Sequence, residues 1–261
     1  MNVDVLGIGI LGPGLEDWPA ARSILTGLMP HTVRPTVKPI PHILPNVERR
    51  RSSEAARLTI KVADDALTMS DLPRDEVATV FTSSDGDGDI TDKICESMAG
   101  SPGGVSPTLF HNSVYNAPAG YWSIGTGSRR SSTSLCAFDY SFAAGLLEAA
   151  AHTTIEQEAV LLVGYDLPFP EPLRAVRNVA HSLAVAFVLA PPRYGASLMR
   201  WWIELESPRP QTGIPDAIDR AVHANPMARS FPLLSVLASG QPQSIVLDYS
   251  NEQSLVVACE A

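Results

Sequence analysis

Cys136 stands in a sequence context that suits a nucleophile. The stretch STSLCAFDYS, residues 132–141, places it after a run of small residues and just ahead of an apolar segment. A thiol at the start of a helix gains thiolate character from the helix dipole, and many cysteine nucleophiles are made in this way. An unperturbed thiol has a pKa of about 8.5 and is only slightly ionised at neutral pH, so a base is also required. Because cysteine also serves as a small buried apolar residue, spacing alone leaves both roles open.

Three glycines near the start of the chain could bind a nucleotide. Gly7, Gly9 and Gly12 match the pattern G-x-G-x-x-G between an expected strand and an expected helix. Glu16 and Asp17 follow where a pyrophosphate would meet helix N–H groups, and carboxylates there repel a diphosphate. No acidic residue ends a strand about 20 residues further on, where a ribose would need one. We therefore interpret the glycines as a tight strand-to-helix turn and expect no cofactor.

An acidic stretch follows the second expected strand and has calcium-loop spacing. Asp85, Asp87, Asp89 and Glu96 occupy positions 1, 3, 5 and 12 of that pattern. Position 6 is Ile90, where the motif needs glycine, and the preceding segment is typical of a strand where the motif needs a helix. We interpret this stretch as a polar turn whose aspartates face a cavity or solvent, and we expect no metal site.

Composition limits the class of protein. A chain of 261 residues with 45% hydrophobic content can bury roughly 70–75% of its unfolded surface, so one full core is expected. The net charge is −9 and the chain has three lysines, which argues against a nucleic-acid partner, and we interpret the ERRRSS run at 48–53 as a solvated arginine cluster. No apolar run approaches the ~20 residues of a membrane span, and the first residues lack the basic start of a signal peptide. Three widely spaced cysteines fit reduced thiols in the cytoplasm.

Alternating strand and helix patterns predict an α/β layered domain. Between them, residues 30–46 are so rich in proline that an extended surface segment is expected. Expected strands span 3–11, 76–84, 131–135, 158–166, 182–190, 197–206, 243–250 and 253–260, and expected helices span 15–27, 53–67, 90–99, 116–125, 138–151, 215–224 and 228–238.

Four segments, in order, resemble the beta-ketoacyl synthases. These are VDVLGIGILGPGLEDWPAARSILTG at 3–27, NAPAGYWSIGTG at 116–127, STSLCAFDYSFAAGLLEAA at 132–150 and EAVLLVGYD at 158–166. The likeness covers about residues 1–190. It implies a thiolase-like layered fold with a complete N-terminal ketosynthase half in residues 1–195. Residues 196–261 would then form a shortened C-terminal half of the same fold.

The chain departs from an active member of that family where catalysis takes place. The family supplies two histidines, in H-G-T and N-x-F-G-F-G-G segments, and a lysine from the second half; neither string occurs here and no lysine follows Lys93. His152, His181 and His223 lie in unrelated contexts. We expect no catalytic residues, only a degenerate nucleophile position near Cys136.

The turn around Cys136 between the expected strand and the expected helix, which we call the elbow, also departs from the family. Leu135 precedes the cysteine and Phe138, Asp139 and Tyr140 follow it, where the family has small residues. The nucleophile position could equally be Leu135 or Ala137.

A short ketosynthase relative of this kind resembles the chain-length-factor-like subunit of aryl-polyene and related type II polyketide or fatty-acid-type systems. The resemblance implies a non-catalytic subunit that forms a heterodimer with an active ketosynthase and shapes its acyl tunnel. The acyl carrier protein would dock mainly on the partner and meet this subunit indirectly. One alternative is an active cysteine-dependent beta-ketoacyl synthase or acyltransferase that uses Cys136. Another is a stand-alone binding protein with a thiolase half-fold.

The same resemblance points to the interface elements, the loop and helix at 84–98 and the helix at 114–124. The side chains expected at the acyl tunnel or interface could equally be ordinary core or dimer contacts. They are Ile90, Ile94, Met98, Val114, Tyr115 and Trp122.

Overall fold

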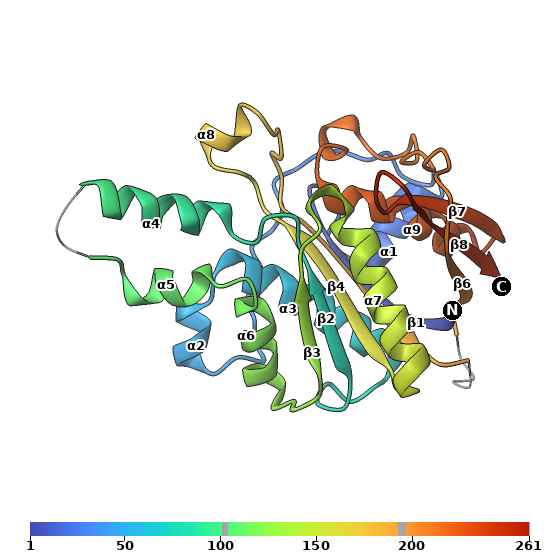
Figure 1. The fold of residues 1–261 in the computed structure, drawn as a ribbon, viewed down its shortest axis with the longest axis horizontal. Coiled ribbons are helices and arrows are strands. Elements are labelled where there is room, and N and C mark those ends of the chain that lie inside the picture. Colours follow the sequence, from blue (N-terminus) through green and yellow to red (C-terminus); the bar gives the residue numbers. More distant parts are fainter. Residues whose placement is uncertain (101–103, 193–196, 261) are drawn as a thin grey trace.

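The computed structural model describes residues 1–100, 104–192 and 197–260, and within them the strands form one mixed sheet of order β3-β2-β4-β5-β1-β6-β8-β7 (Figure 1). β2 pairs in parallel with β3 and with β4, while the remaining neighbours are antiparallel. The carboxyl ends of β2, β3 and β4 therefore meet at one edge. The strands are β1 (Asn2–Leu11), β2 (Ala78–Thr82), β3 (Ser132–Leu135), β4 (Val160–Asp166), β5 (Leu183–Ala190), β6 (Met199–Glu206), β7 (Gln243–Asp248) and β8 (Ser254–Glu260).

Helices cover both faces of this sheet and divide the core into two clusters. α3 and α6 pack on one face, and α1, α7 and α9 pack on the other (Figure 1). The α-helices are α1 (Trp18–Leu25), α2 (Asn46–Arg51), α3 (Glu54–Ser70), α4 (Gly88–Gly100), α5 (Pro107–Ser113), α6 (Ala117–Thr126), α7 (Ser141–Glu156), α8 (Glu171–Arg174) and α9 (Phe231–Ser239). Short 3-10 turns are η1 (Phe138–Tyr140), η2 (Arg220–Val222) and η3 (Pro226–Ser230).

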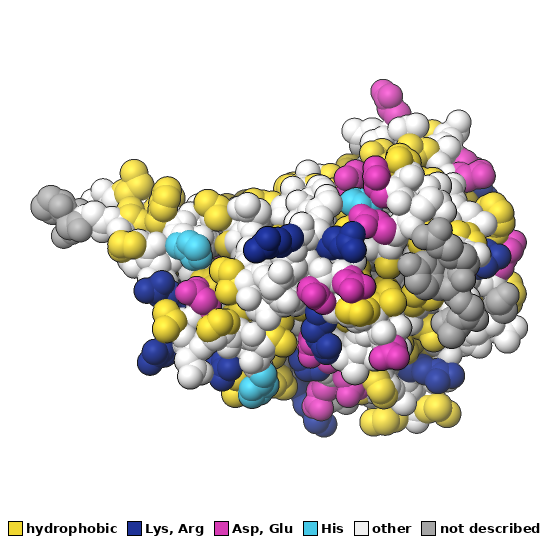
Figure 2. All heavy atoms as spheres, turned by 90° about the horizontal axis from the view of Figure 1, so that it is seen from below, with side chains coloured by type: hydrophobic (Ala, Val, Ile, Leu, Met, Phe, Trp, Pro, Cys, Tyr) yellow, Lys and Arg dark blue, Asp and Glu magenta, His cyan; other side chains and the backbone are white. Residues whose placement is uncertain are grey.

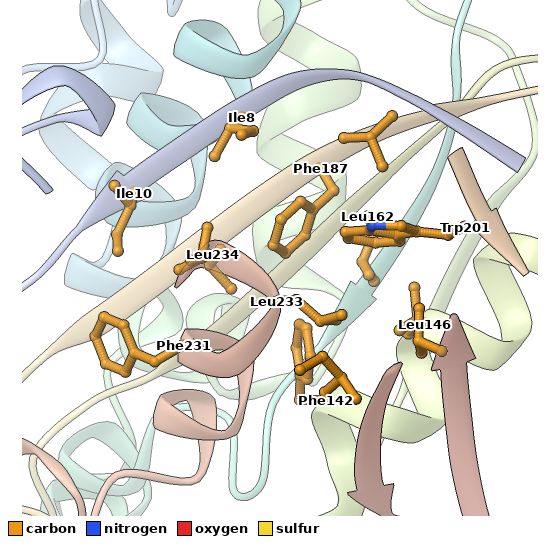
Figure 3. Close-up of a cluster of buried hydrophobic side chains, with 14 of the residues drawn as sticks. Ile8, Ile10, Phe142, Leu146, Leu162, Phe187, Trp201, Phe231, Leu233 and Leu234 are labelled. Carbon is orange, nitrogen blue, oxygen red and sulfur yellow. The ribbon is translucent and has the colours of Figure 1, made fainter. Parts of the chain in front are cut away.

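The core beneath α7 and α9 joins the two ends of the chain (Figure 3). Phe187 of β5 lies between Phe142 of α7 and Trp201 of β6, with ring centroids 6.1 and 5.4 Å away. Every residue of β4 and β5 is buried, as their continuous apolar sequences predict for strands covered on both faces. Strands β6–β8 thus extend the same sheet and share the same core.

The first two glycines of the G-x-G-x-x-G pattern serve packing. A Cβ atom at Gly9 would lie 1.9 Å from the carbonyl oxygen of Val62, and one at Gly7 would lie 2.1 Å from that of Ala66. Both carbonyls belong to α3, so the glycines let the helix backbone lie directly on β1. The tight turn expected after the strand is present, because Gly12 and the residue three places on exchange backbone hydrogen bonds of 2.8 and 3.1 Å.

One expected helix, 215–224, is wrong. The segment forms turns with i to i+3 hydrogen bonds, from Ile218 N–H to Pro215 and from Val222 N–H to Asp219, and only η2 is regular. The Asp219 carboxylate accepts the Ala221 N–H, which offers the backbone an alternative to a helix. Helices α2, α5 and α8 were not expected from the sequence.

The expected boundary between residues 195 and 196 lies outside the described residues. Among the described helices, none is both long and apolar enough to cross a bilayer.

Candidate functional site

Polar side chains from three strand ends meet where the parallel strands terminate. Ser83 and Ser84 follow β2, Cys136 follows β3, and Asp166 ends β4. Asp166 Oδ1 accepts hydrogen bonds from Ser83 Oγ at 3.0 Å, Ser84 Oγ at 2.8 Å and Ser84 N–H at 2.8 Å. The Cys136 thiol donates to the Ser84 carbonyl oxygen at 3.3 Å. The carboxyl edge of parallel strands is where α/β proteins commonly place their sites.

Cys136 lies further from the start of a helix than the sequence predicted, because the helix expected from residue 138 begins at Ser141. Regular helix begins at Ser141, and the turn η1 comes between. Phe138 has a φ of +52°, a left-handed conformation that bulky residues rarely adopt. Ser141 fixes this turn, because its hydroxyl accepts the Ala137 N–H at 2.9 Å and donates to the Phe138 carbonyl at 2.6 Å. Phe138 therefore holds the strained position between strand and helix, and the dipole of α7 acts on Cys136 only from a distance.

Two of the histidines considered from the sequence, His152 and His223, are engaged elsewhere. His152 Nε2 lies 2.8 Å from Glu158 Oε1, eleven residues and about 16 Å along α7 from its start. His223 Nε2 lies 3.0 Å from the Ile218 carbonyl oxygen. The hydrogen bond of the Cys136 thiol goes to the Ser84 carbonyl oxygen and not to one of these histidines.

An arginine links the elbow to the loop that follows β4. The guanidinium of Arg177 lies 3.9 Å from the ring centroid of Phe138 and 5.1 Å from that of Phe169, and it forms an ion pair with Asp139. Cation–π contacts of this kind favour a fixed loop position. The exposed Phe138 ring is thereby held over the elbow.

Helices α4 and α5, which we call the finger (residues 88–100 and 107–113), project from the body of the protein (Figure 1). Gly88 and Ile90 are the buried residues of α4, and Asn112 is that of α5. Met98 is 73% exposed and Phe110 is 65% exposed. Figure 2 shows hydrophobic side chains gathered on this projecting part. With so few buried residues, the finger lacks the packing that normally supports a helix. Isolated helices of this length are only marginally stable in water.

Three of the expected tunnel or interface residues share one side of α4. Ile90 is buried at the base of the finger, Ile94 is half-buried and Met98 is exposed near its tip. Their spacing of four residues places them in a row along the helix.

The other three lie nearer the sheet. Val114 is exposed at the end of α5. The Tyr115 hydroxyl accepts the Ser83 N–H at 2.8 Å and donates to the Leu135 carbonyl at 2.7 Å, so it ties the loop after β2 to the end of β3. Trp122 is buried against α3, which makes it a core residue of this chain and removes it from the exposed surface.

A groove of about 450 Å³ lies at the base of the finger, between α4, the start of α3 and the loop after β4. Ile90, Leu167 and Phe169 line its apolar part. At its rim Lys38 pairs with Glu54 at 3.0 Å. The groove is separate from Cys136, which does not line it.

Two aspartates of the calcium-like pattern stabilise helix α4. Asp87 caps the helix by accepting the Ile90 N–H at 3.2 Å, and Asp89 pairs with Lys93. Burial raises the pKa of Asp87 to about 6, against the lowering effect of that N–H. Within the described ranges no three His, Cys, Asp or Glu side chains are grouped to hold a metal ion.

Sequence reasoning missed Asp166, Phe138 and Arg177. For Asp166 a signal was present: a lone carboxylate ends the buried strand EAVLLVGYD, where a charged group needs partners. The left-handed Phe138 and its contact with Arg177 have no local sequence signal, because the two residues meet only through the fold.

The mixed α/β fold is that of a thiolase-like ketosynthase half. The chain belongs to the family described as beta-ketoacyl synthase, N-terminal domain, which it matches over residues 28–243. No curated protein matches the sequence significantly.

Solved structures share the fold over most or all of the chain. A ketosynthase, ApeO, in complex with its chain length factor, ApeC, from Xenorhabdus doucetiae matches with a TM-score of 0.75 and 22% identity over 99% of both chains. The ishigamide ketosynthase/chain length factor matches with a TM-score of 0.74 and 12% identity over 100% of this chain and 99% of that one. A beta-ketoacyl synthase from Burkholderia phymatum matches with a TM-score of 0.62 and 14% identity over 79% of this chain and 64% of its own. At these identities the likeness establishes the fold.

Proposed function

We propose that this chain is a non-catalytic, chain-length-factor-like subunit that pairs with an active beta-ketoacyl synthase and forms part of the wall of its acyl tunnel. Two of the structures that match it over nearly their whole length contain a ketosynthase with a chain length factor. A third, AntDE with AntF, contains an acyl-carrier protein in complex with its ketosynthase. On this proposal the carrier meets the present subunit only indirectly. The protein would work in the cytoplasm, and its three free thiols are consistent with a reducing compartment.

The observation that carries the proposal is the uncovered finger. Met98 and Phe110 are large apolar side chains, and both are mostly exposed on helices with almost no buried residues. Burying them against a second protein would supply the packing that the finger lacks. β3 supports the same conclusion, since it ends the sheet order and an edge strand is open to pairing.

The elbow supports a non-catalytic role. The Cys136 thiol donates a hydrogen bond to a carbonyl oxygen, the strained turn position belongs to Phe138, and the histidine segments of active family members do not occur in the sequence. Carbon–carbon bond formation from an extender thioester needs a thiolate and a stabilised carbanion. We infer that the partner supplies both.

The tunnel wall is assigned to the row Ile90, Ile94 and Met98, with Val114 and Tyr115 at its base. Ile94, Met98 and Val114 reach the surface along the finger, where a partner would cover them. Ile90 is buried at the base of the finger, and Tyr115 is bonded to the ends of β2 and β3. A smaller residue at the closed end of such a tunnel leaves room for a longer acyl chain. Met98→Ala in the assembled complex is therefore expected to lengthen the product.

The test is coexpression with each ketosynthase of the source organism, followed by a size measurement. We expect a stable one-to-one complex in which the partner alone is acylated by a thioester. If the isolated chain joined two acyl groups by itself, or if it formed no complex with any of these ketosynthases, the proposal would be wrong.

The alternative is an enzyme that uses Cys136, and one observation favours it: the thiol is exposed beside the elbow. Cys95 on α4 is also exposed and serves as an internal control. An activated Cys136 would be alkylated by iodoacetamide much faster than Cys95 and would take up an acyl group from a thioester, both of which mass spectrometry detects. Equal alkylation of the two thiols without acylation would exclude this alternative.

A further inference from the structure

The two oxygens of the Asp166 carboxyl group differ in their hydrogen bonding. Its Oδ1 atom accepts three hydrogen bonds, all from Ser83 and Ser84, whereas its Oδ2 atom is buried and has no hydrogen-bond partner in the described part of the chain. The side chain is 1% exposed. An ionised carboxylate in such a place would leave charge on an oxygen that neither water nor protein solvates, so the geometry favours the neutral acid.

This carboxyl group fixes the loop from which the finger extends. Ser83 Oγ donates to Asp166 and in turn accepts the Gly86 N–H at 2.8 Å, which closes the turn. Gly86 has a φ of +75° and is followed directly by Asp87, the residue that caps α4. The start of α4 is therefore positioned through two hydrogen bonds by Asp166.

The surroundings of Asp166 contain one positive charge and several groups that oppose ionisation. Arg177, on the loop after α8, lowers the pKa of Asp166, as do the bonds from Ser83 and Ser84. Burial outweighs these effects and raises its pKa to about 7. The other titratable groups facing this region are Tyr165 on β4, Tyr115 before α6, Cys136 after β3, and Asp85 and Asp87 in the loop after β2.

We propose that Asp166 is a proton-dependent contact: the neutral carboxyl holds the loop 83–86 closed against the end of β4, and loss of the proton opens this loop and frees the start of α4. The ionised form needs a hydrogen-bond donor at Oδ2, and in the closed loop no described group supplies one. Protonation near neutral pH thus controls how firmly the finger is held. If the finger is the pairing surface, as the proposed function has it, pairing weakens as the pH rises; this last step rests on that function.

The experiment uses the isolated, full-length chain and follows amide hydrogen exchange at Ser84 and Gly86 between pH 6 and pH 8.5, corrected for the intrinsic rate. Both N–H groups belong to the loop's hydrogen bonds. We expect their protection to fall about tenfold across this range in the wild type and to stay constant in Asp166→Asn, which is neutral at every pH and keeps Oδ1. Asp85→Asn, in the same loop, is the control and should retain the wild-type response.

Equal pH responses of wild type and Asp166→Asn, or protection that rises with pH, would overturn the proposal. Should Asp166→Asn not fold, the carboxyl carbon of Asp166 is titrated by NMR in the wild type: a midpoint near 7 supports the proposal and one below 5 overturns it. Because the partner is absent from both measurements, a failure here is independent of whether the chain pairs with a ketosynthase.

Discussion

The finger offers the most direct test of pairing. In the double variant Met98→Ser/Phe110→Ser, two apolar side chains at the projecting end of the molecule become small and polar. Neither packs into the core of the free chain, so we expect the variant to fold with a stability within about 0.5 kcal/mol of the wild type. The effect of the substitutions should therefore be seen in binding alone.

The magnitude follows from the exposed fractions. Burying a whole Met or Phe side chain contributes about 1.5–3 kcal/mol. Met98 is 73% exposed and Phe110 is 65% exposed, so most of that contribution, about 1–2 kcal/mol each, is still available in the free chain. Losing both would weaken pairing by about 2–4 kcal/mol, or about 30- to 700-fold in Kd.

The assay is titration calorimetry or analytical ultracentrifugation of the purified chain with its ketosynthase. Leu28→Ser is the matched control, because Leu28 is 78% exposed and follows α1, which packs on the other side of the molecule from the finger (Figure 1). The control should pair as tightly as the wild type. An unchanged Kd in the double variant, or an equal loss in the control, would refute the assignment of the finger as the pairing surface.

Three further predictions concern stability. Gly9→Ala should lower Tm by about 5–10 °C in a thermal melt, because its Cβ would meet the α3 backbone, whereas Gly120→Ala, which has open space around it, should not. Tyr115→Phe loses the hydroxyl that joins the ends of β2 and β3 and should lower the free energy of unfolding in urea by about 1–3 kcal/mol. Folding raises the pKa of Asp87 from an ordinary 3.8 to about 6, so its protonated form stabilises the fold fully below pH 3.8, and this contribution is lost as the pH rises through about 6. In Asp87→Asn the slope of Tm against pH should therefore be smaller between these two values. Above pH 7 the slope should be that of the wild type.

The parts of the fold that the sequence predicted are those fixed by local patterns. β4 and β5 follow from unbroken apolar runs, and the turn at Gly12 follows from its glycine and proline. The close approach of α3 to β1 could not be predicted, since Gly9 meets Val62 across 53 residues of sequence and only the packed structure brings them together.

At the candidate site the types of residue can be predicted from the sequence, but their contacts and hydrogen bonds depend on the fold. Cys136 and Asp166 could be named or noticed from strand ends, but the three bonds on one Asp166 oxygen depend on the register of β2 beside β4. For Trp122 the sequence left two roles open, a core residue or a tunnel and interface residue. In the structure it is buried in the core of its own chain, because α6 packs on α3 through that side. Helical spacing alone does not say which side of a helix a neighbour covers.

The loop between β2 and α4 connects the two halves of the functional argument. Its residues contact the elbow on one side, through Tyr115 and the thiol of Cys136, and carry the finger on the other. In an enzyme such a loop would have to leave room for a thioester at the elbow. Here the Ser84 carbonyl accepts a hydrogen bond from the thiol and Phe138 lies over the turn. Asp166 holds the same loop through its bonds with Ser83 and Ser84. On the proposed function this subunit presents a surface to another protein and therefore needs a rigid base for the finger. We accordingly expect changes in this loop to alter the strength of pairing rather than any reaction at Cys136.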